Sequence, residues 1–262
     1  MQLITQHSLA SQLTALGVSP GDGVFVHASM RAIGPVVGGP RAVILALRAA
    51  VGEDGLIAMP GFSTDAYWPE WLDPSTLSQA ERAEVEAGAP GFDVATSPTV
   101  GMGAIAELFR TWPGTLRSDH PTVSVCVHGR DAGRFVQSHS RPFACGPGTP
   151  FVSLIERPAM KVLLLGVGWN RCTALHTAET LATPRRYKVR RFKENGAWHE
   201  TDDVADDLGR LFPTAGAAFE ATGAVAEGPV GDAPAKLAPM AELVGFAAEF
   251  IGAANRESGD RA

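Results

Sequence analysis

The feature that most constrains the fold is a series of short apolar runs separated by longer segments with helical periodicity. Strands are predicted at 24–29 (VFVHAS), 55–60 (GLIAMP), 122–129 (TVSVCVHG) and 161–168 (KVLLLGVG), the last being the most apolar. Between and before them, segments such as 5–16, 38–52 and 102–112 predict helices. This alternation predicts an α/β fold with a mixed, largely parallel central sheet flanked by helices.

Three regions depart from this alternation. Residues 61–99 contain Trp68, Trp71 and several prolines without sustained periodicity, which predicts a long loop or lid. Residues 187–200 predict a β-hairpin around Asn195-Gly196, and we expect it near the active site. The tail, 253–262, is expected to fray. The whole chain, 1–262, is long enough to bury a large core and is interpreted as a single α/β domain.

Composition excludes several classes of protein. The net charge is −6 and no run of lysines or arginines occurs, so nucleic acid is not an expected partner and a cationic small molecule fits better. Three cysteines without C-x-x-C spacing predict neither a disulfide framework nor a zinc knuckle. Neither a secretory signal nor an apolar window of ~20 residues is found, which predicts a cytoplasmic protein that does not enter a membrane.

The segment after the most apolar strand carries a histidine and a carboxylate. Thr173 is a good N-cap for a helix from Ala174, which places His176 in the first turn and Glu179 on the same face at i+3. The helix terminus and Arg171 disfavour a positive charge on the imidazole, whereas a contact with Glu179 favours it. A histidine balanced in this way can be neutral near pH 7 and act as a general base. The alternative is a structural histidine. Its position after a buried strand, where α/β sheets bind ligands, favours the base.

Two further segments combine small residues with a helix start. Phe25, His27 and Ser29 share one face of a strand, and the glycines after them begin a helix near Pro40 whose amides could receive a phosphate. Ser97, Thr99 and Gly101 precede another helix and are either caps or contacts to an anionic cofactor. Both segments are also consistent with ordinary turns, and His120-Pro121 with a rigid strand entry.

Several known motifs are missing. The sequence has no G-x-S-x-G elbow, no H-E-x-x-H, no Walker loop and no G-x-G-x-x-G at a predicted βαβ unit. The segment H-T-A-E offers a single imidazole, which is too few ligands for a metal site.

Taken together, six collinear segments resemble the aminoglycoside 3-N-acetyltransferase family. They are GDGVFVHASMRAIGPVVGG, LIAMPGFS, SPTVGMGAIAELFR, RSDHPTVSV, VLLLGVG and TALHTAE, and the resemblance spans roughly residues 8–250. The acetyltransferase superfamily with the R/Q-x-x-G-x-G/A motif does not fit. The resemblance implies acetyl transfer from acetyl-CoA to the 3-amino group of a polycationic aminoglycoside antibiotic, without a covalent intermediate.

The resemblance also implies roles for individual residues. His176 would be the base, and Glu179 would orient it or hold the acceptor. The cofactor would lie along Val26 to Gly39 and the helix start at 97–103, which gives as candidate contacts His27, Ser29, Met30, Arg31, Val37, Gly38, Ser97, Thr99 and Gly101.

A polycationic acceptor should meet carboxylates from several segments. The candidates are Glu179, Asp65, Asp202 and Asp203, although the last two also fit solvated surface charges.

The sequence departs from the family pattern on the expected acceptor side, at Pro60-Gly61-Phe62-Ser63 and at 168–172 (GWNRC). Alternatives therefore remain: transfer to another small amine, a non-catalytic ligand-binding relative, or a hydrolase using Ser29 or Cys145.

Overall fold

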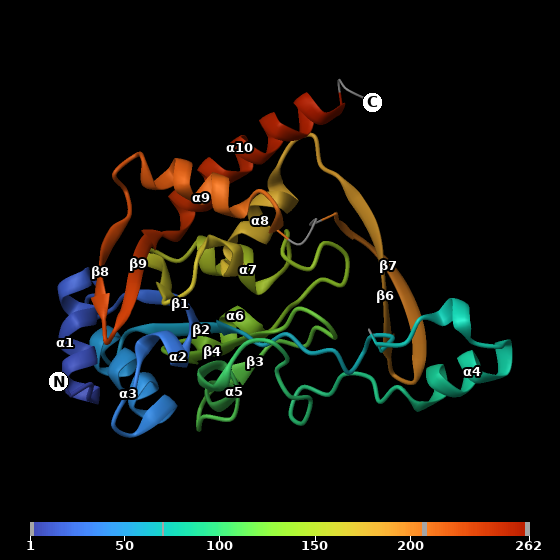
Figure 1. Ribbon diagram of the computed structural model, residues 1–262, viewed down its shortest axis with the longest axis horizontal. Helices are drawn as coiled ribbons and strands as arrows, with labels where there is room; N and C mark the ends of the chain where they lie inside the picture. The colour runs from blue at the N-terminus through green and yellow to red at the C-terminus, as the bar shows by residue number, and fades with distance from the viewer. Residues whose placement is uncertain (1–2, 70, 206–208, 260–262) are drawn as a thin grey trace.

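The computed structural model describes residues 3–69, 71–205 and 209–259. One seven-stranded sheet crosses the described part of the chain, with the strand order β3-β4-β2-β1-β5-β9-β8 (Figure 1). The strands are β1 (Gly23–Ala28), β2 (Leu56–Pro60), β3 (Leu116–Arg117), β4 (Val125–Gly129), β5 (Met160–Leu165), β8 (Ala226–Val230) and β9 (Ala233–Pro239).

The three central strands are parallel. β1 pairs with both β2 and β5 in parallel, whereas β4 and β9 run antiparallel to their neighbours on either side. β3 and β8 therefore run in the same direction as the central three. The expectation of a mixed, largely parallel α/β sheet is confirmed, and the carboxyl ends of β1, β2 and β5 meet at one edge.

Helices cover both faces of the sheet because successive side chains of a strand point to opposite sides. Val24, Val26, Leu163 and Leu165 face one layer, and Phe25 with its neighbours faces the other. The first layer consists of α1 (Gln6–Leu16), α3 (Gly39–Val51) and α5 (Ala104–Arg110), with the short α2 (Met30–Ile33). The second consists of α6 (Ala132–Val136), α7 (Pro150–Ile155), α8 (Ala174–Leu181), α9 (Phe212–Glu220) and α10 (Met240–Gly259).

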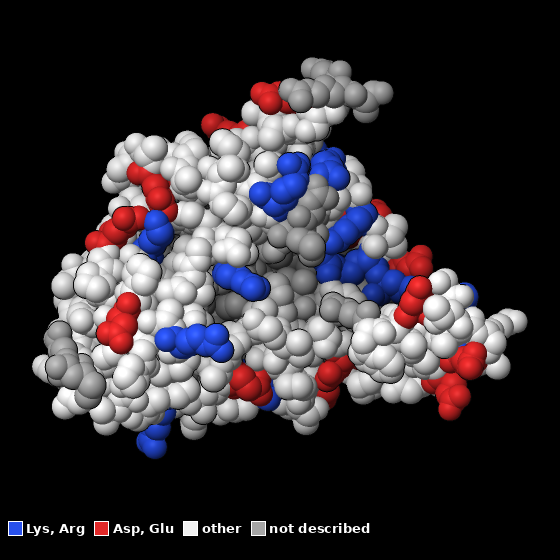
Figure 2. All heavy atoms as spheres, in the orientation of Figure 1, with Lys and Arg blue, Asp and Glu red and all other residues white. Residues whose placement is uncertain are grey.

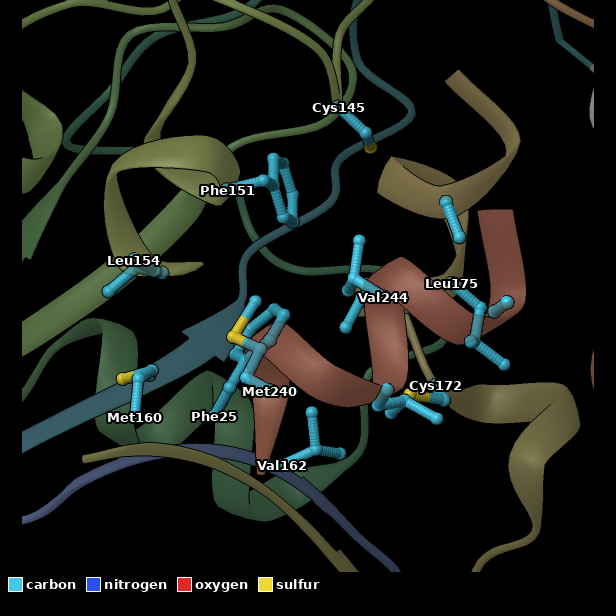
Figure 3. Packing of buried hydrophobic residues seen from close by; sticks show 14 of the residues in the cluster. Phe25, Cys145, Phe151, Leu154, Met160, Val162, Cys172, Leu175, Met240 and Val244 are labelled. Carbon is cyan, nitrogen blue, oxygen red and sulfur yellow. The ribbon is translucent and has the colours of Figure 1, made fainter. Parts of the chain in front are cut away.

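The second layer carries the larger cluster of buried side chains. Figure 3 shows Phe25 from the sheet together with Phe151 from α7 and with Met240 and Val244 from α10. All four are at most 2% exposed. This layer anchors α8, the helix that carries His176.

The predicted hairpin is present and lies apart from the main sheet. β6 (Tyr187–Glu194) and β7 (Ala197–Val204) form a two-stranded sheet, with Asn195 and Gly196 at the turn in left-handed conformations (φ 51° and 79°). The strands extend four residues beyond the predicted end, from 200 to Val204.

The region 61–99 is not one long loop. It contains the 3₁₀ turn η1 (Pro74–Thr76) and the helix α4 (Gln79–Gly88). Figure 1 shows α4 beside the hairpin on the side of the molecule away from α1. Ser78 and Glu81 form a capping box, and Lys193 of the hairpin donates to main-chain carbonyls at the other end, including those of Glu86 and Ala89. The expectation of an unbroken loop is therefore wrong for these two segments. The sequence of α4 did not indicate a helix because, with no residue buried, it has no apolar stripe.

The tail is helical further than expected. α10 continues to Gly259, so the expected fraying is wrong for residues 253–259, while 260–262 lie outside the described residues. Asn255 Nδ2 donates to the Pro184 carbonyl at 2.8 Å and Arg256 Nη1 to the Thr183 carbonyl at 2.7 Å. These contacts with the chain after α8 hold the last turns. No helix of the described residues is long and apolar enough to span a membrane.

Candidate active site

His176 and Glu179 form a hydrogen-bonded pair at the carboxyl edge of the sheet. After β5 the chain passes through η2 (Trp169–Arg171) and enters α8, where His176 Nδ1 lies 2.8 Å from Glu179 Oε2. The Phe212 ring meets the imidazole edge-on at 4.7 Å between centroids. Because a carboxylate only accepts, Nδ1 carries the proton and Nε2 is the nitrogen left to take one. The side chain of His176 is 23% exposed and that of Glu179 is 8% exposed.

The start of α8 is held in place by His27, a residue of β1. Thr173 occupies the expected N-cap position of α8, which begins at Ala174. It has helical angles (φ −60°, ψ −27°) and its side chain makes no cap hydrogen bond, so the expected capping by the hydroxyl is wrong. Its amide N–H instead donates to His27 Nε2 at 2.9 Å. β1 thereby fixes the position of the helix that carries His176.

His27 is a buried, neutral imidazole. Burial lowers its pKa from 6.5 to about 3, the Phe25 carbonyl partly opposes this shift, and the charge of nearby His176 adds to it. The side chain was expected to contact the cofactor, and it lines the cleft described next while being only 6% exposed.

A cleft of about 380 Å³ lies beside the carboxyl ends of β1 and β2. It contains five of the nine expected cofactor contacts: His27, Ser29, Met30, Arg31 and Gly101. The remaining lining residues are Val26, Ala28, Met59, Pro60, Met102, Gly103, Ala104, Ile105, Ala106, Val167, Arg171 and Thr173. Arg31 and Arg171 are exposed, so the cleft presents two cationic side chains to a ligand.

The other four expected cofactor contacts lie outside this cleft. Ser97 donates from Oγ to Asp65 at 2.7 Å, and the Thr99 amide donates to Glu107 at 2.7 Å, so both hold the chain before α5 in place. Val37 is 60% exposed, and Gly38 precedes α3 in a left-handed conformation. The tertiary structure uses these small residues to shape turns.

A second cleft, which we call the His176 cleft, has a volume of about 310 Å³. Met102 lines both clefts and so marks where they adjoin. The residues lining the His176 cleft are Phe62, Ser63, Thr64, Tyr67, Val100, Met102, Thr122, Val123, Ala144, Cys145, His176, Arg190, Asp203 and Val204. Figure 2 shows a hollow on this side of the molecule with Lys and Arg side chains along its edge.

Only one of the four expected acceptor carboxylates lines the His176 cleft. Asp203 does so, 2% exposed and paired with Arg190, so it is not a solvated surface charge. Asp202 is exposed and does not line the cleft. Asp65 lines a neighbouring cavity of about 500 Å³ that also contains Trp68 and Trp71. Glu179 lies beside a small void of about 20 Å³ instead.

The wall of the His176 cleft at residues 144–145 is supported by buried histidines. Ser118 Oγ lies 2.9 Å from His139 Nδ1, and His139 Nε2 lies 2.8 Å from the Ala144 carbonyl. The rings of His120 and His139 lie 4.4 Å apart, and the Val123 amide donates to His120 Nδ1. Burial lowers the pKa of His120 to about 2 and of His139 to about 4. His120 was interpreted as a residue at a rigid strand entry; in the structure it also contacts His139 and so helps to support this wall.

Tyr67, Arg190 and Met102 are among the residues of the His176 cleft that the sequence did not single out. Tyr67 lies in a segment without periodicity, and Arg190 had no distinguishing spacing on the hairpin. Met102, where the clefts adjoin, resembles any apolar residue near a helix start. No local pattern marked them. Among the described residues, no group of three or more His, Cys, Asp or Glu side chains could hold a metal ion.

Comparison with known proteins finds similar sequences over most of the chain. The sequence model described as "Aminoglycoside 3-N-acetyltransferase" matches residues 25–251. The chain is 34% identical over 258 residues to the SPbeta prophage-derived aminoglycoside N(3')-acetyltransferase-like protein YokD of Bacillus subtilis (strain 168), covering 94% of this chain and 92% of that protein. It is 32% identical over 259 residues to aminoglycoside N(3)-acetyltransferase III of Pseudomonas aeruginosa, covering 94% and 93%.

Solved structures share the fold. AAC-IIIb in a binary complex with CoASH has a TM-score of 0.82 and 31% identity, covering 94% of this chain and 96% of that one. AAC-VIa bound to sisomicin has a TM-score of 0.81 and 32% identity, covering 96% and 98%.

Proposed function

Because this chain belongs to the aminoglycoside 3-N-acetyltransferase family, we propose that it transfers the acetyl group of acetyl-CoA to the 3-amino group of an aminoglycoside. Acetyl-CoA is the co-substrate of the family, and one related structure holds CoASH. Another related structure holds sisomicin, a molecule of this acceptor class. The matching relatives are acyltransferases by name.

The observation that carries the proposal is the position of the His176–Glu179 pair. His176 lines the cleft that adjoins the cationic cleft at Met102, and Glu179 holds its Nδ1–H at 2.8 Å. An amine bound in the His176 cleft thus lies next to a base, while a thioester bound in the adjoining cleft lies within reach of that amine. Holding both reactants in one geometry supplies much of the rate enhancement in such transfers.

The reaction is a direct transfer. The amine nitrogen forms a bond to the thioester carbon as the carbon–sulfur bond breaks, and His176 Nε2 takes one proton from the nitrogen. CoA leaves as a thiolate, to which that proton is finally returned. Glu179 stabilises the imidazolium formed in between.

The residues of the cationic cleft that contains Arg31 and Arg171 fit CoA. The exposed guanidiniums of Arg31 and Arg171 match phosphate charges, and Met30, Met59 and Met102 offer apolar contacts to the chain that bears the thioester. Ser29 Oγ accepts from the Ala32 amide at 3.3 Å, so this hydroxyl caps α2.

Mass spectrometry of reactions with acetyl-CoA and an aminoglycoside panel tests the proposal. One added acetyl group per acceptor is expected, and replacing His176 by Ala should lower kcat by ~100- to 10,000-fold while leaving the fold intact. The exposed His199, replaced by Ala, is the matched control. A folded His176→Ala protein with near-normal turnover would exclude His176 as the base.

Direct transfer has its own test. The intact mass of the enzyme after exposure to acetyl-CoA alone should be unchanged. An acetylated enzyme that passes its acetyl group to acceptor would instead indicate a covalent route through a residue such as Ser29 or Cys145.

A further inference from the structure

Three side chains from distant segments meet on one wall of the His176 cleft. Tyr67 comes from the region 61–99, Arg190 from β6 and Asp203 from β7, and all three line the cleft. Arg190 Nε donates to Asp203 Oδ2 at 2.5 Å, and Arg190 Nη1 donates to the Tyr67 hydroxyl. This Arg190 wall joins the hairpin to the region 61–99.

The hairpin register places the two charges side by side. Arg190 pairs with Thr201 and Lys188 with Asp203, so Arg190 and Asp203 are diagonal neighbours on one face of the hairpin. Their side chains are 15% and 2% exposed. Charges this deeply buried require a partner of opposite sign, and Arg190 and Asp203 are each other's partner.

In this ion pair the positive charge of Arg190 offsets the negative charge of Asp203. Its second oxygen, Oδ1, also accepts a hydrogen bond, from the Val204 amide at 2.8 Å. Burial alone would lower the pKa of Arg190, but Tyr67 and Asp203 outweigh it and raise that pKa above its ordinary value. Among the described residues that line the cleft, Asp203 is the only carboxylate and Arg190 the only guanidinium.

The guanidinium also retains hydrogen-bond donors. Within the described part of the chain, the two hydrogen bonds of Arg190 use Nε and Nη1, out of five N–H groups. A hydroxyl oxygen of a ligand can accept from the remaining N–H groups, whereas an ammonium group has no lone pair to accept with and is repelled by the guanidinium.

We propose that Arg190 determines acceptor specificity, by favouring aminoglycosides that present a hydroxyl rather than a further ammonium group to the Arg190 wall. This inference rests on the proposed function, because it concerns which aminoglycosides the His176 cleft accepts. It replaces the expectation that Asp203 attracts the acceptor's charge.

Two matched drug pairs test the inference. Paromomycin and kanamycin A carry a hydroxyl where neomycin and kanamycin B, respectively, carry an ammonium group. The wild-type kcat/KM is expected to favour the hydroxyl member of at least one pair. Replacing Arg190 by Gln leaves Asp203 uncompensated and should lower that preference by about tenfold.

Arg191→Gln is the matched control. Arg191 is the next residue of β6, is 43% exposed and pairs with Glu86 at 2.8 Å, so the same change of charge occurs outside the cleft. Its preference ratio should equal that of the wild type.

Two further variants separate charge from space. Asp203→Asn leaves Arg190 uncompensated and should raise the preference for the hydroxyl member, and the double replacement Arg190→Gln with Asp203→Asn should fall between the single variants. These two variants carry the test if Arg190→Gln does not fold. The inference is overturned if the wild type does not prefer the hydroxyl member of either drug pair. It is also overturned if the folded variants leave the ratio of kcat/KM between the two members unchanged.

Failure of the proposed function would look different. A wild-type protein that acetylates none of the four drugs refutes that function alone, and the drug pairs can then be compared by calorimetric binding. The expected order of affinities is the same as that of kcat/KM, and equal affinities in the wild type and Arg190→Gln would overturn the inference.

Discussion

Acidification from pH 7 to pH 5 should destabilise this protein through three buried imidazoles. Burial lowers the pKa of His27 to about 3, of His120 to about 2 and of His139 to about 4. Unfolded histidines titrate near 6.5, so below that pH the unfolded chain binds protons that the folded chain refuses. The stability from these groups is full above pH 6.5 and is lost progressively as the pH falls, down to about 4 for His139, about 3 for His27 and about 2 for His120.

The magnitude follows from the interval between the unfolded pKa and pH 5. That interval is about 1.5 units, and at 1.36 kcal/mol per unit each histidine costs about 2 kcal/mol of unfolding free energy at pH 5. The three together cost about 6 kcal/mol, comparable with the whole stability of many domains. Each is at most 8% exposed, so solvent screening reduces the effect little.

Replacing His139 by Gln isolates one contribution. The glutamine amide can still donate to the Ala144 carbonyl, as His139 Nε2 does, but it does not titrate. Urea unfolding at pH 7 and pH 5, followed by tryptophan fluorescence, should show the variant losing about 2 kcal/mol less than the wild type between the two pH values.

The exposed His7, replaced by Gln, is the control and should lose as much stability as the wild type. Protonation of carboxylates affects all three proteins alike. Equal losses in the wild type and His139→Gln would refute the argument.

Three other changes have definite expected outcomes. Glu179→Gln should lower kcat by about tenfold to a hundredfold, since a neutral amide stabilises the His176 imidazolium less, and an unchanged pre-steady-state rate would contradict this. Gly216→Ala should lower the unfolding free energy by about 1–3 kcal/mol, because the new Cβ would lie 2.1 Å from Trp169 Cγ. In Gly245→Ala nothing lies within 4 Å and no loss should appear in a melting curve. Arg171→Gln should raise the KM for acetyl-CoA about threefold to tenfold at low salt and less at high salt, with the acceptor KM unaffected; a salt-independent effect would argue against a phosphate contact.

Local pattern was sufficient for the parts of the fold that depend on neighbours in sequence. The apolar strands, the turn at Asn195-Gly196 and the shared helix face of His176 and Glu179 all follow from side-chain periodicity or from one backbone conformation. These features need no knowledge of the rest of the chain. They include the two residues on which the proposed chemistry depends.

The identity of the cleft walls depended on contacts between distant segments. His27 receives the Thr173 amide across 146 residues, and Arg190 reaches Tyr67 across 123. The sequence favoured a surface charge over an acceptor contact for Asp203, whereas the pairing of β6 with β7 buries it beside Arg190. A carboxylate's role is set by which charge lies nearest in space. For Asp203 the register of β6 against β7 sets that neighbour, and Tyr67 from the region 61–99 then contacts the same guanidinium.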